Sequence, residues 1–347
     1  MNPLTGYNYC KSFTIVHSPD GSQSNYQMKL TIIRGAGTSS TGTLYLDNKS
    51  INWPLDIRFT QSDGVTLLPF YRREYDATDG TWWLLIDSIP DPANFTGYVH
   101  VGNAAATDAS NISTTFGVGM ADDFEWGSDE DEIDTSGGNI TWAKIAVPNA
   151  YARIDTAQCW QGTRSLRLTC VAGKPADAYF TKAVGTDYAI NFMVRHDNDS
   201  QAVFLHGNGT HIIYAYISPA LDLEWYDGAN TDTGFNATVS VWEEQEINDI
   251  NLATPKWDWW WTGTKIANDA LCLHGATQNG VIDFENADPG TYHVDSVLVR
   301  KWTANEPAFG VWGTWERISP YTGPIIITRP KYKIEVRDAN GVLKWVL

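Results

Sequence analysis

The sequence is short of cysteine and has no long apolar run, and each shortage excludes a class of protein. The four cysteines (Cys10, Cys159, Cys170 and Cys272) include no Cys-x-x-Cys pair, so we expect buried free thiols rather than a zinc site or a dense disulfide framework. No apolar stretch is long enough for a membrane-spanning helix. Residues 1–7 lack the basic and apolar regions of a secretory signal, so a surface role would need another route of export, such as release by lysis.

Basic residues are also scarce. The chain has 24 Lys and Arg against 41 Asp and Glu, which gives a formal net charge of −17 and an isoelectric point near 4.7. Nucleic acids and anionic membrane surfaces would repel such a chain, so neither is expected as a partner.

Aromatic residues, in contrast, are abundant. The 347 residues include 16 Trp, 16 Tyr and 12 Phe, and the length allows two domains of ordinary size. Large aromatic side chains fill the interiors of β-sandwiches and also stack on sugar rings. Core packing is the default use, and a stacking platform is the alternative.

Residues 1–119 read as short strands separated by turns. Residues 12–16 alternate in polarity, residues 56–70 form a strand, an Asp-Gly turn and a second strand, and residues 82–90 and 96–103 continue the pattern. We therefore expect an antiparallel sandwich. Residues 104–119 are rich in Ala, Thr, Ser and Gly, and we expect a linker or a closing edge of the sandwich there.

The runs DIRFTQSDGVTLLPF, WWLLIDSIP and YVHVGNAAATDASN occur in that order within this first region. They resemble the DUF2341 family over roughly residues 8–118, with His100 and Val101 departing from the family's usual tyrosines. The resemblance implies a surface protein, but it assigns no chemistry.

Residues 120–316 also show strand patterns. They begin with Asp-Asp-Phe-Glu, continue with Gly-Thr-Arg-Ser-Leu-Arg-Leu, and close with YHVDSVLVRKWTANEPAFGVWGTWE. This order resembles concanavalin A-like jelly rolls, which include laminin-G-like and carbohydrate-binding modules. The predicted fold class is therefore all-β: two tandem β-sandwiches, the second a jelly roll.

Residues 317–347 predict a C-terminal β-hairpin extension. The segment YKIEVRDANGVLKWVL bears a faint resemblance to the openings of phage tail-tip proteins. An isolated hairpin is marginally stable, so we expect it to dock on a sheet or on another subunit, in a homo-oligomer or a neighbouring structural protein.

The resemblance to calcium-containing jelly rolls implies a structural Ca²⁺ site between the first and last strands of the second domain. The matching carboxylates are Glu125 and Asp295, and Asp123 could assist. Calcium takes six to eight oxygen ligands, among which backbone carbonyls are common. The alternative is that these acids are solvated charges at a sheet edge.

Three aromatic residues are candidates for stacking on a glycan: Trp225, Tyr226 and Trp260. Along a strand, Trp257, Trp259 and Trp261 face one way and Trp260 the other, so one set fills the core and the other meets solvent or ligand.

Glycoside hydrolysis would need two carboxyl groups at a defined separation. Glu244 and Glu246 share one strand face, but the Glu-x-Asp-x-x-Glu arrangement of jelly-roll glucanases is absent. We therefore expect no catalytic residues. The sequence favours a non-catalytic, surface-exposed adhesin or receptor-binding module that recognises glycan, extracellular or on a virion. A scaffold protein without ligand and a glucanase-like hydrolase are the alternatives.

Overall fold

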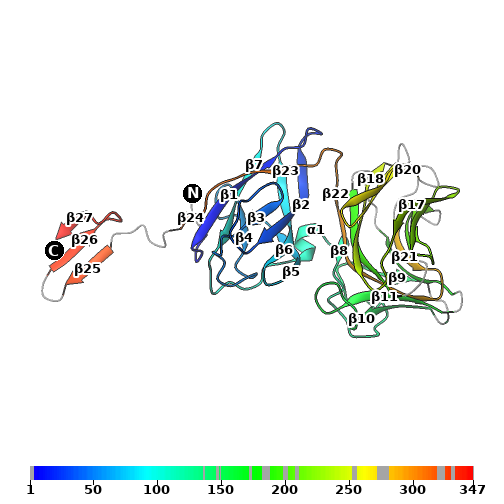
Figure 1. Ribbon diagram of the computed structural model, residues 1–347. Coiled ribbons are helices and arrows are strands. Elements are labelled where there is room, and N and C mark those ends of the chain that lie inside the picture. Colours follow the sequence, from blue (N-terminus) through cyan, green and yellow to red (C-terminus); the bar gives the residue numbers. More distant parts are fainter. Residues whose placement is uncertain are drawn as a thin grey trace.

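The computed structural model describes residues 4–135, 137–145, 148, 150–171, 174–181, 188–197, 202–207, 211–251, 256–271, 281–318, 325–329 and 333–346. The described chain is almost entirely β-structure, as the sequence predicts. Two β-sandwiches lie side by side, and a small separate sheet lies at the C-terminal end (Figure 1).

The first sandwich packs a five-stranded sheet against a four-stranded one. The five-stranded sheet contains β23 (Ala308–Trp312), β1 (Tyr9–Val16), β7 (Phe95–Val101) and β4 (Arg58–Gln61), with β24 (Glu316–Arg317) also paired to β1. The four-stranded sheet has the order β3 (Thr43–Tyr45), β2 (Gln23–Ile33), β6 (Asp79–Ile89) and β5 (Phe70–Tyr75). Side chains that alternate inward, such as Phe13, Ile15, Leu30 and Trp82, form the core.

The chain returns to this sandwich after it has built the second one. The sequence prediction placed residues 308–316 in the second domain, but β23 and β24 pair with β1 of the first. Phe309 is buried in the first core and stacks on Trp312, with ring centroids 5.5 Å apart. Burial of this aromatic pair gives a physical reason for the return.

The second sandwich packs an eight-stranded sheet against a seven-stranded one. The eight-stranded sheet contains β10 (Tyr151–Asp155), β11 (Ser165–Cys170), β22 (Gly290–Lys301), β13 (Tyr188–His196), β18 (Trp242–Asn251), β19 (Lys256–Trp261) and β20 (Thr264–Leu271), with β8 (Ala121–Asp122) also paired to β22. The seven-stranded sheet contains β17 (Asn230–Asn236), β16 (Asp222–Tyr226), β15 (His211–Ile217), β14 (Ala202–Gly207), β21 (Val281–Asn286), β12 (Ala176–Thr181) and β9 (Ala143–Lys144). Phe192, Phe204 and Phe284 meet between the sheets, with ring centroids 5.1 to 5.6 Å apart.

The strands that enter and leave the second sandwich are neighbours. Asp122 of β8 lies opposite Val297 of β22, and Ala121 lies opposite Leu298. This adjacency confirms the prediction on which the proposed cation site depends.

The expected linker contains a short helix, α1 (Ile112–Phe116), which lies between the sandwiches (Figure 1). The side chain of Asn111 accepts a hydrogen bond from the backbone N–H of Thr114 and caps the helix. Phe116 packs edge-on against Tyr71 and Trp83 of the first sandwich, with ring centroids 6.2 and 5.8 Å apart. The connection between the domains is therefore a packed contact.

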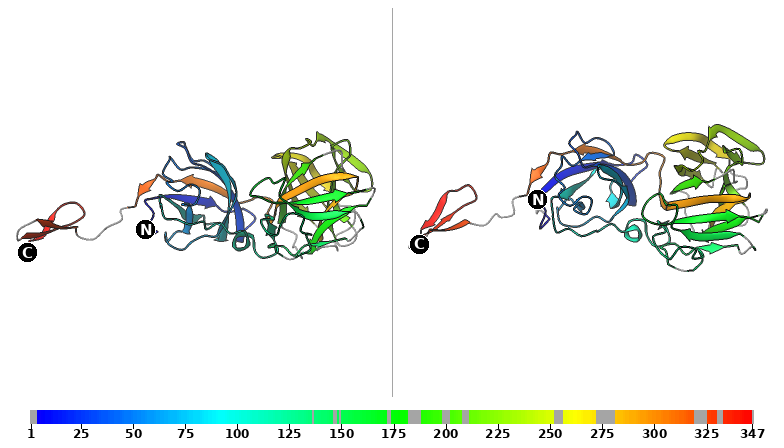
Figure 2. Two further views of the ribbon diagram at one scale, coloured as in Figure 1. Left: turned by 90° about the horizontal axis from the view of Figure 1, so that it is seen from below. Right: turned by 60° about the horizontal axis from the view of Figure 1, so that its bottom comes forward.

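The C-terminal segment forms a three-stranded sheet, not the predicted hairpin. β26 (Lys333–Arg337) pairs on one side with β25 (Ile325–Arg329) and on the other with β27 (Leu343–Val346). Within the described residues these strands pair with no strand of either sandwich, and Figure 2 shows the sheet standing apart.

The cysteine prediction holds in part. Cys10 is a buried free thiol, Cys159 is a free thiol but only half-buried, and Cys170 is buried. Cys272 lies outside the described residues.

Candidate functional site

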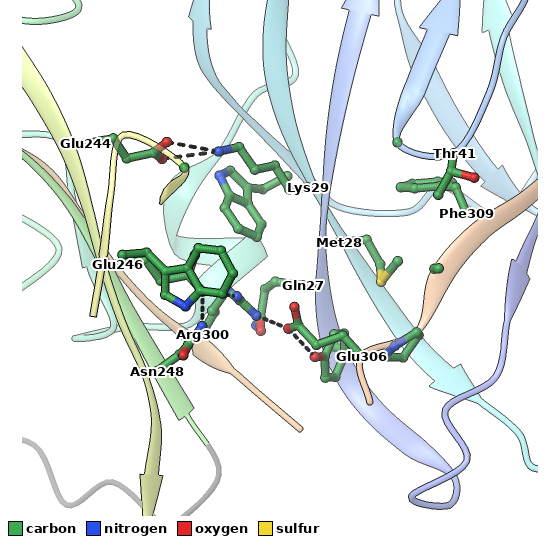
Figure 3. A pocket seen from close by; sticks show the side chains of 17 residues that line it. Gln27, Met28, Lys29, Thr41, Glu244, Glu246, Asn248, Arg300, Glu306 and Phe309 are labelled. Carbon is green, nitrogen blue, oxygen red and sulfur yellow. Dashed lines mark hydrogen bonds and ion pairs between the residues drawn. The ribbon is translucent and has the colours of Figure 1, made fainter. Parts of the chain in front are cut away.

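A pocket of about 460 Å³ lies where the two sandwiches meet (Figure 3). The outer face of β2 forms one wall, and the outer faces of β18, β19 and β22 form the other. The segment that returns to the first sandwich closes one end. We call this site the interdomain pocket, and its lining residues are Tyr26, Gln27, Met28, Lys29, Thr41, Gly42, Trp83, Glu244, Glu246, Asn248, Trp260, Gly263, Arg300, Glu306, Pro307, Ala308 and Phe309.

Trp260 brings an aromatic ring to this pocket. On β19 the side chains of Trp257, Trp259 and Trp261 are buried in the core of the second sandwich, whereas Trp260 points the other way and is half-buried. The expected division of this tryptophan run between core and surface is confirmed. The ammonium of Lys265 lies 5.2 Å from the centroid of the Trp260 ring.

Glu244 is held between two cations of the first sandwich. Its carboxylate pairs with the guanidinium of Arg73, which is 2% exposed. It also pairs with the ammonium of Lys29 at 3.2 Å (Figure 3). Burial by itself would raise the pKa of Glu244, but the two positive charges outweigh it and hold the pKa at about 2. Glu244 is therefore a permanently charged acceptor at neutral pH.

Glu246, two residues along the same strand face, sits in a second network. It accepts hydrogen bonds from Asn191 and Asn248 at 2.6 Å and pairs with Arg300 at 2.9 Å. Burial opposes ionisation, but the charge of Arg300 and the two amide donors lower the pKa of Glu246 overall. Arg300 is 4% exposed and also pairs with Glu306 at the closed end of the pocket (Figure 3).

Sequence reasoning singled out Trp260, Glu244 and Glu246 on the second-domain wall but missed its other residues and the whole wall from the first domain. Gln27 and Lys29 alternate with core residues along β2, a pattern that any two-faced strand shows. Gln27 nevertheless accepts a hydrogen bond from the backbone N–H of Lys301 at 3.1 Å. No local signal distinguishes an outer face that meets another domain from one that meets water.

The three predicted metal ligands line a second hollow at the interface, of about 500 Å³. Glu125 is turned toward the backbone at residues 162–165. One of its carboxylate oxygens accepts hydrogen bonds from the N–H groups of Thr163 and Arg164, at 2.7 and 3.0 Å. Gly162 fits this contact because a Cβ there would lie 2.1 Å from that oxygen.

Asp295 is 1% exposed and accepts hydrogen bonds from the N–H groups of Trp160 at 2.9 Å and Ser296 at 2.6 Å. Burial raises its pKa well above the usual range, and the charge of Asp123 adds to the rise. Asp123 in turn accepts a hydrogen bond from the Tyr71 hydroxyl at 3.3 Å.

A divalent cation would fit the charge of this hollow, because it would stabilise the buried carboxylates of Asp123 and Asp295. Among the described residues, however, no three His, Cys, Asp or Glu side chains group closely enough to hold a metal. Most of a calcium ion's ligands would therefore be backbone carbonyls and water. Calcium here stays a prediction.

Trp225 and Tyr226 lie on β16 in the seven-stranded sheet, apart from both hollows. Trp225 is half-buried and packs against the core of the second sandwich. Tyr226, its neighbour in sequence, packs on the outer face with Tyr214 and Tyr216. The structure therefore separates Trp260 from the other two predicted stacking residues.

The only helix in the described part of the chain is α1, whose five residues are too few to cross a membrane.

Three solved structures give the level of similarity to known folds. A sialidase aligns with a TM-score of 0.41 and 9% identity, over 62% of this chain and 20% of its own, so this chain spans only a small part of that protein. An endo-beta-1,4-glucuronan lyase from the fungus Trichoderma reesei aligns with a TM-score of 0.37 and 11% identity, over 52% of this chain and 96% of its own. A carbohydrate esterase from the Shiga toxin-encoding bacteriophage phi24B aligns with a TM-score of 0.36 and 15% identity, over 47% of this chain and 90% of its own.

No curated protein matches the sequence. Residues 53–144 do match the sequence model of a family described as "Domain of unknown function (DUF2341)", so the resemblance of the first sandwich to that family is confirmed.

Proposed function

We propose that this protein is a non-catalytic module that binds glycan in the interdomain pocket. One observation carries the proposal: a half-buried tryptophan, Trp260, lines a cavity of about 460 Å³ together with fixed polar side chains from both sandwiches. Aromatic rings stack on the apolar faces of sugars, and cavities of this size hold small ligands.

The polar groups of the pocket match a neutral saccharide. Glu244 and Glu246 are ionised acceptors, while Lys29, Asn248 and Arg300 are donors. Each sugar hydroxyl both donates and accepts hydrogen bonds, so it can use an acceptor and a donor that lie side by side. Each acid is already paired with a cation, so a charged ligand would disturb this balance.

The same pairing argues against hydrolysis. A glycosidase acid must keep its proton at working pH, which requires a raised pKa. The pKa values of Glu244 and Glu246 are both lowered by neighbouring cations. Neither side chain is suited to protonate a leaving group, so the glucanase-like interpretation gains no support from this pocket.

The finer role that we propose is that of a surface adhesin or receptor-binding protein, extracellular or on a virion. The detached C-terminal sheet supports it, because three short strands that pair with neither sandwich are suited to attachment. We propose that residues 317–347 bind a second copy of the chain or a neighbouring structural subunit. Calcium between Asp123 and Asp295 would stabilise the second sandwich.

Glycan-array binding followed by calorimetry tests the function. We expect Trp260→Ala to weaken binding of the best glycan at least about tenfold, the scale of losing a central aromatic contact. Trp242→Ala is the matched control, because Trp242 is a half-buried outer-face residue of the same sheet that does not line the pocket. Equal losses in both variants would argue against binding in the interdomain pocket, and no glycan bound by the parent would instead support a scaffold protein without ligand.

A further inference from the structure

The outer face of the seven-stranded sheet is unlike an ordinary solvated face. Inward residues such as Ala178 and Phe284 belong to the core, so Asp177, Asp283 and Glu285 project outward. Cross-strand pairing arranges the outward side chains in two rows. One row runs Asp177, Glu285, Val203, Tyr216 and Glu224, and the other includes Tyr179, Asp283, Tyr214 and Tyr226. We call this surface the acid–tyrosine face.

The three carboxyl groups at one end of the face lie on two neighbouring strands, and the described residues place no cation beside them. Asp177 lies directly opposite Glu285, and Asp283 follows on the same strand face. Asp177 is only 5% exposed, and its Oδ1 atom, like that of Asp283, has no hydrogen-bond partner. Within the described residues, no Lys, Arg or His pairs with any of the three.

The folded protein raises the pKa values of these three acids. Burial raises the pKa of Asp177 to about 6. Burial and the charge of Asp177 raise that of Glu285 to about 7, and burial with both neighbours raises that of Asp283 to about 8. Buried acids are ordinarily paired with a cation, and among the residues that the structure describes this group has none. The missing partner is a positive charge.

The rings of Tyr214 and Tyr216 on β15 lie two strands away from the acids on β21. Tyr214 packs edge-on against Tyr216 and Tyr226, with ring centroids 5.6 and 5.9 Å apart, and the Tyr216 hydroxyl donates to Glu224. Adjacent strands are about 4.8 Å apart, so the rings on β15 lie roughly 10 Å from the acids on β21. Val203 is the outward residue between Glu285 and Tyr216. The face thus has a partly exposed anionic end and a partly exposed aromatic end, and the buried Val203 lies between them.

We propose that the acid–tyrosine face binds a cationic amino sugar, with its protonated amine among Asp177, Asp283 and Glu285 and its ring toward the tyrosines. An ammonium group satisfies unpaired carboxylates, and sugar rings pack on aromatic side chains. A bare metal ion fits less well, because no three acidic side chains of the described residues group closely enough to hold one. This site is separate from the interdomain pocket.

Binding at this face should depend on pH. A cation binds the ionised carboxylates and lowers their pKa, so affinity rises with pH from about 5 to 7 and protons are released from the carboxyl groups on binding. Affinity falls again at higher pH, where the amine of the sugar loses its own proton. The other titratable groups near the three acids are Tyr179 on β12, Tyr214 and Tyr216 on β15, Glu224 and Tyr226 on β16, and Tyr292 on β22. Tyr214, Tyr216 and Tyr292 stay neutral over this range, because their pKa values are raised.

Calorimetry with the β-1,4-linked trisaccharide of glucosamine tests the proposal, with the N-acetylated trisaccharide as uncharged control. At about pH 7, where the sugar amines still carry protons and part of the acid group is ionised, we expect only the amine form to bind, with affinity at least about tenfold weaker at about pH 5. The double variant Asp283→Asn with Glu285→Gln should lose binding. Trp260→Ala should keep it, which separates this site from the interdomain pocket.

Four results would overturn the proposal. These are equal binding of both trisaccharides, full binding by the double variant, competition by calcium chloride alone, and cleavage of the trisaccharide. The double variant should be at least as stable as the parent at about pH 8, because it removes buried charge. A loss of binding in a protein of unchanged melting temperature therefore cannot be attributed to unfolding.

Discussion

Asp283→Asn should make the protein more stable at alkaline pH and leave its stability at acid pH unchanged. Burial and the charges of Asp177 and Glu285 raise the pKa of Asp283 in the folded state to about 8, from an ordinary value of 3.8. Below about pH 4 the carboxyl is protonated whether the chain is folded or unfolded, so no penalty exists. Between about pH 4 and 8 the folded state holds a proton that the unfolded state releases, and stability falls as pH rises.

The size of the effect follows from the difference of about four pH units (8 − 3.8). Each unit corresponds to about 1.4 kcal/mol, which gives an upper bound of about 6 kcal/mol. The side chain is partly exposed, so solvent screens the interaction, and we expect about 2–3 kcal/mol of stabilisation from the substitution at about pH 8.

Urea unfolding followed by tryptophan fluorescence at about pH 4, 6 and 8 measures the effect. The matched control is Asp232→Asn, an exposed carboxylate on β17 of the same sheet, which should change the free energy of unfolding by less than about 0.5 kcal/mol at every pH. A parallel shift of the Asp283→Asn curve at all three pH values would refute the reasoning, because the linkage requires the gain to vanish in acid.

Three further outcomes are expected. Glu244→Gln should destabilise the domain interface by about 2–3 kcal/mol in thermal unfolding, because it leaves a buried guanidinium with a weaker partner, whereas removal of the exposed amine in Lys29→Met should cost less than about 1 kcal/mol. Gly162→Ala should lower the melting temperature more than Gly263→Ala does, since both have positive φ (74° and 79°) but only the Cβ at 162 would clash with a carboxylate. Removal of calcium with EDTA should lower the melting temperature of the second sandwich and re-addition should restore it, and an unchanged transition would argue against a bound cation.

Local patterns predicted the elements of this protein well. In the run Lys-Trp-Asp-Trp-Trp-Trp, the period of two placed Trp260 on the opposite face from Trp257, Trp259 and Trp261, and the structure shows that the set of three fills the core. This succeeds because one side of each strand must be buried, and alternation is a property of the backbone itself. The same argument placed Glu244 and Glu246 on one face.

Long-range pairing could not be derived in the same way. Nothing near Phe309 shows that its strand returns to β1, nearly three hundred residues earlier in the chain. The ionisation of Glu244 depends on Arg73, which is 171 residues away in sequence. Which residues meet across the domain interface depends on which two outer sheet faces pack together. That packing depends on the shapes of the complete sheets, which no short stretch of sequence determines.

The sequence by itself therefore determined the all-β class, the two sandwiches and the inward or outward direction of individual side chains, because these follow from the two-residue repeat of a strand. Only the tertiary structure decided that Glu244 faces two cations while Asp283, within the described part of the chain, faces two other acids and no cation. A carboxyl group's chemistry is set by the charges and solvent within a few ångströms, and in this protein those neighbours come from strands distant in sequence.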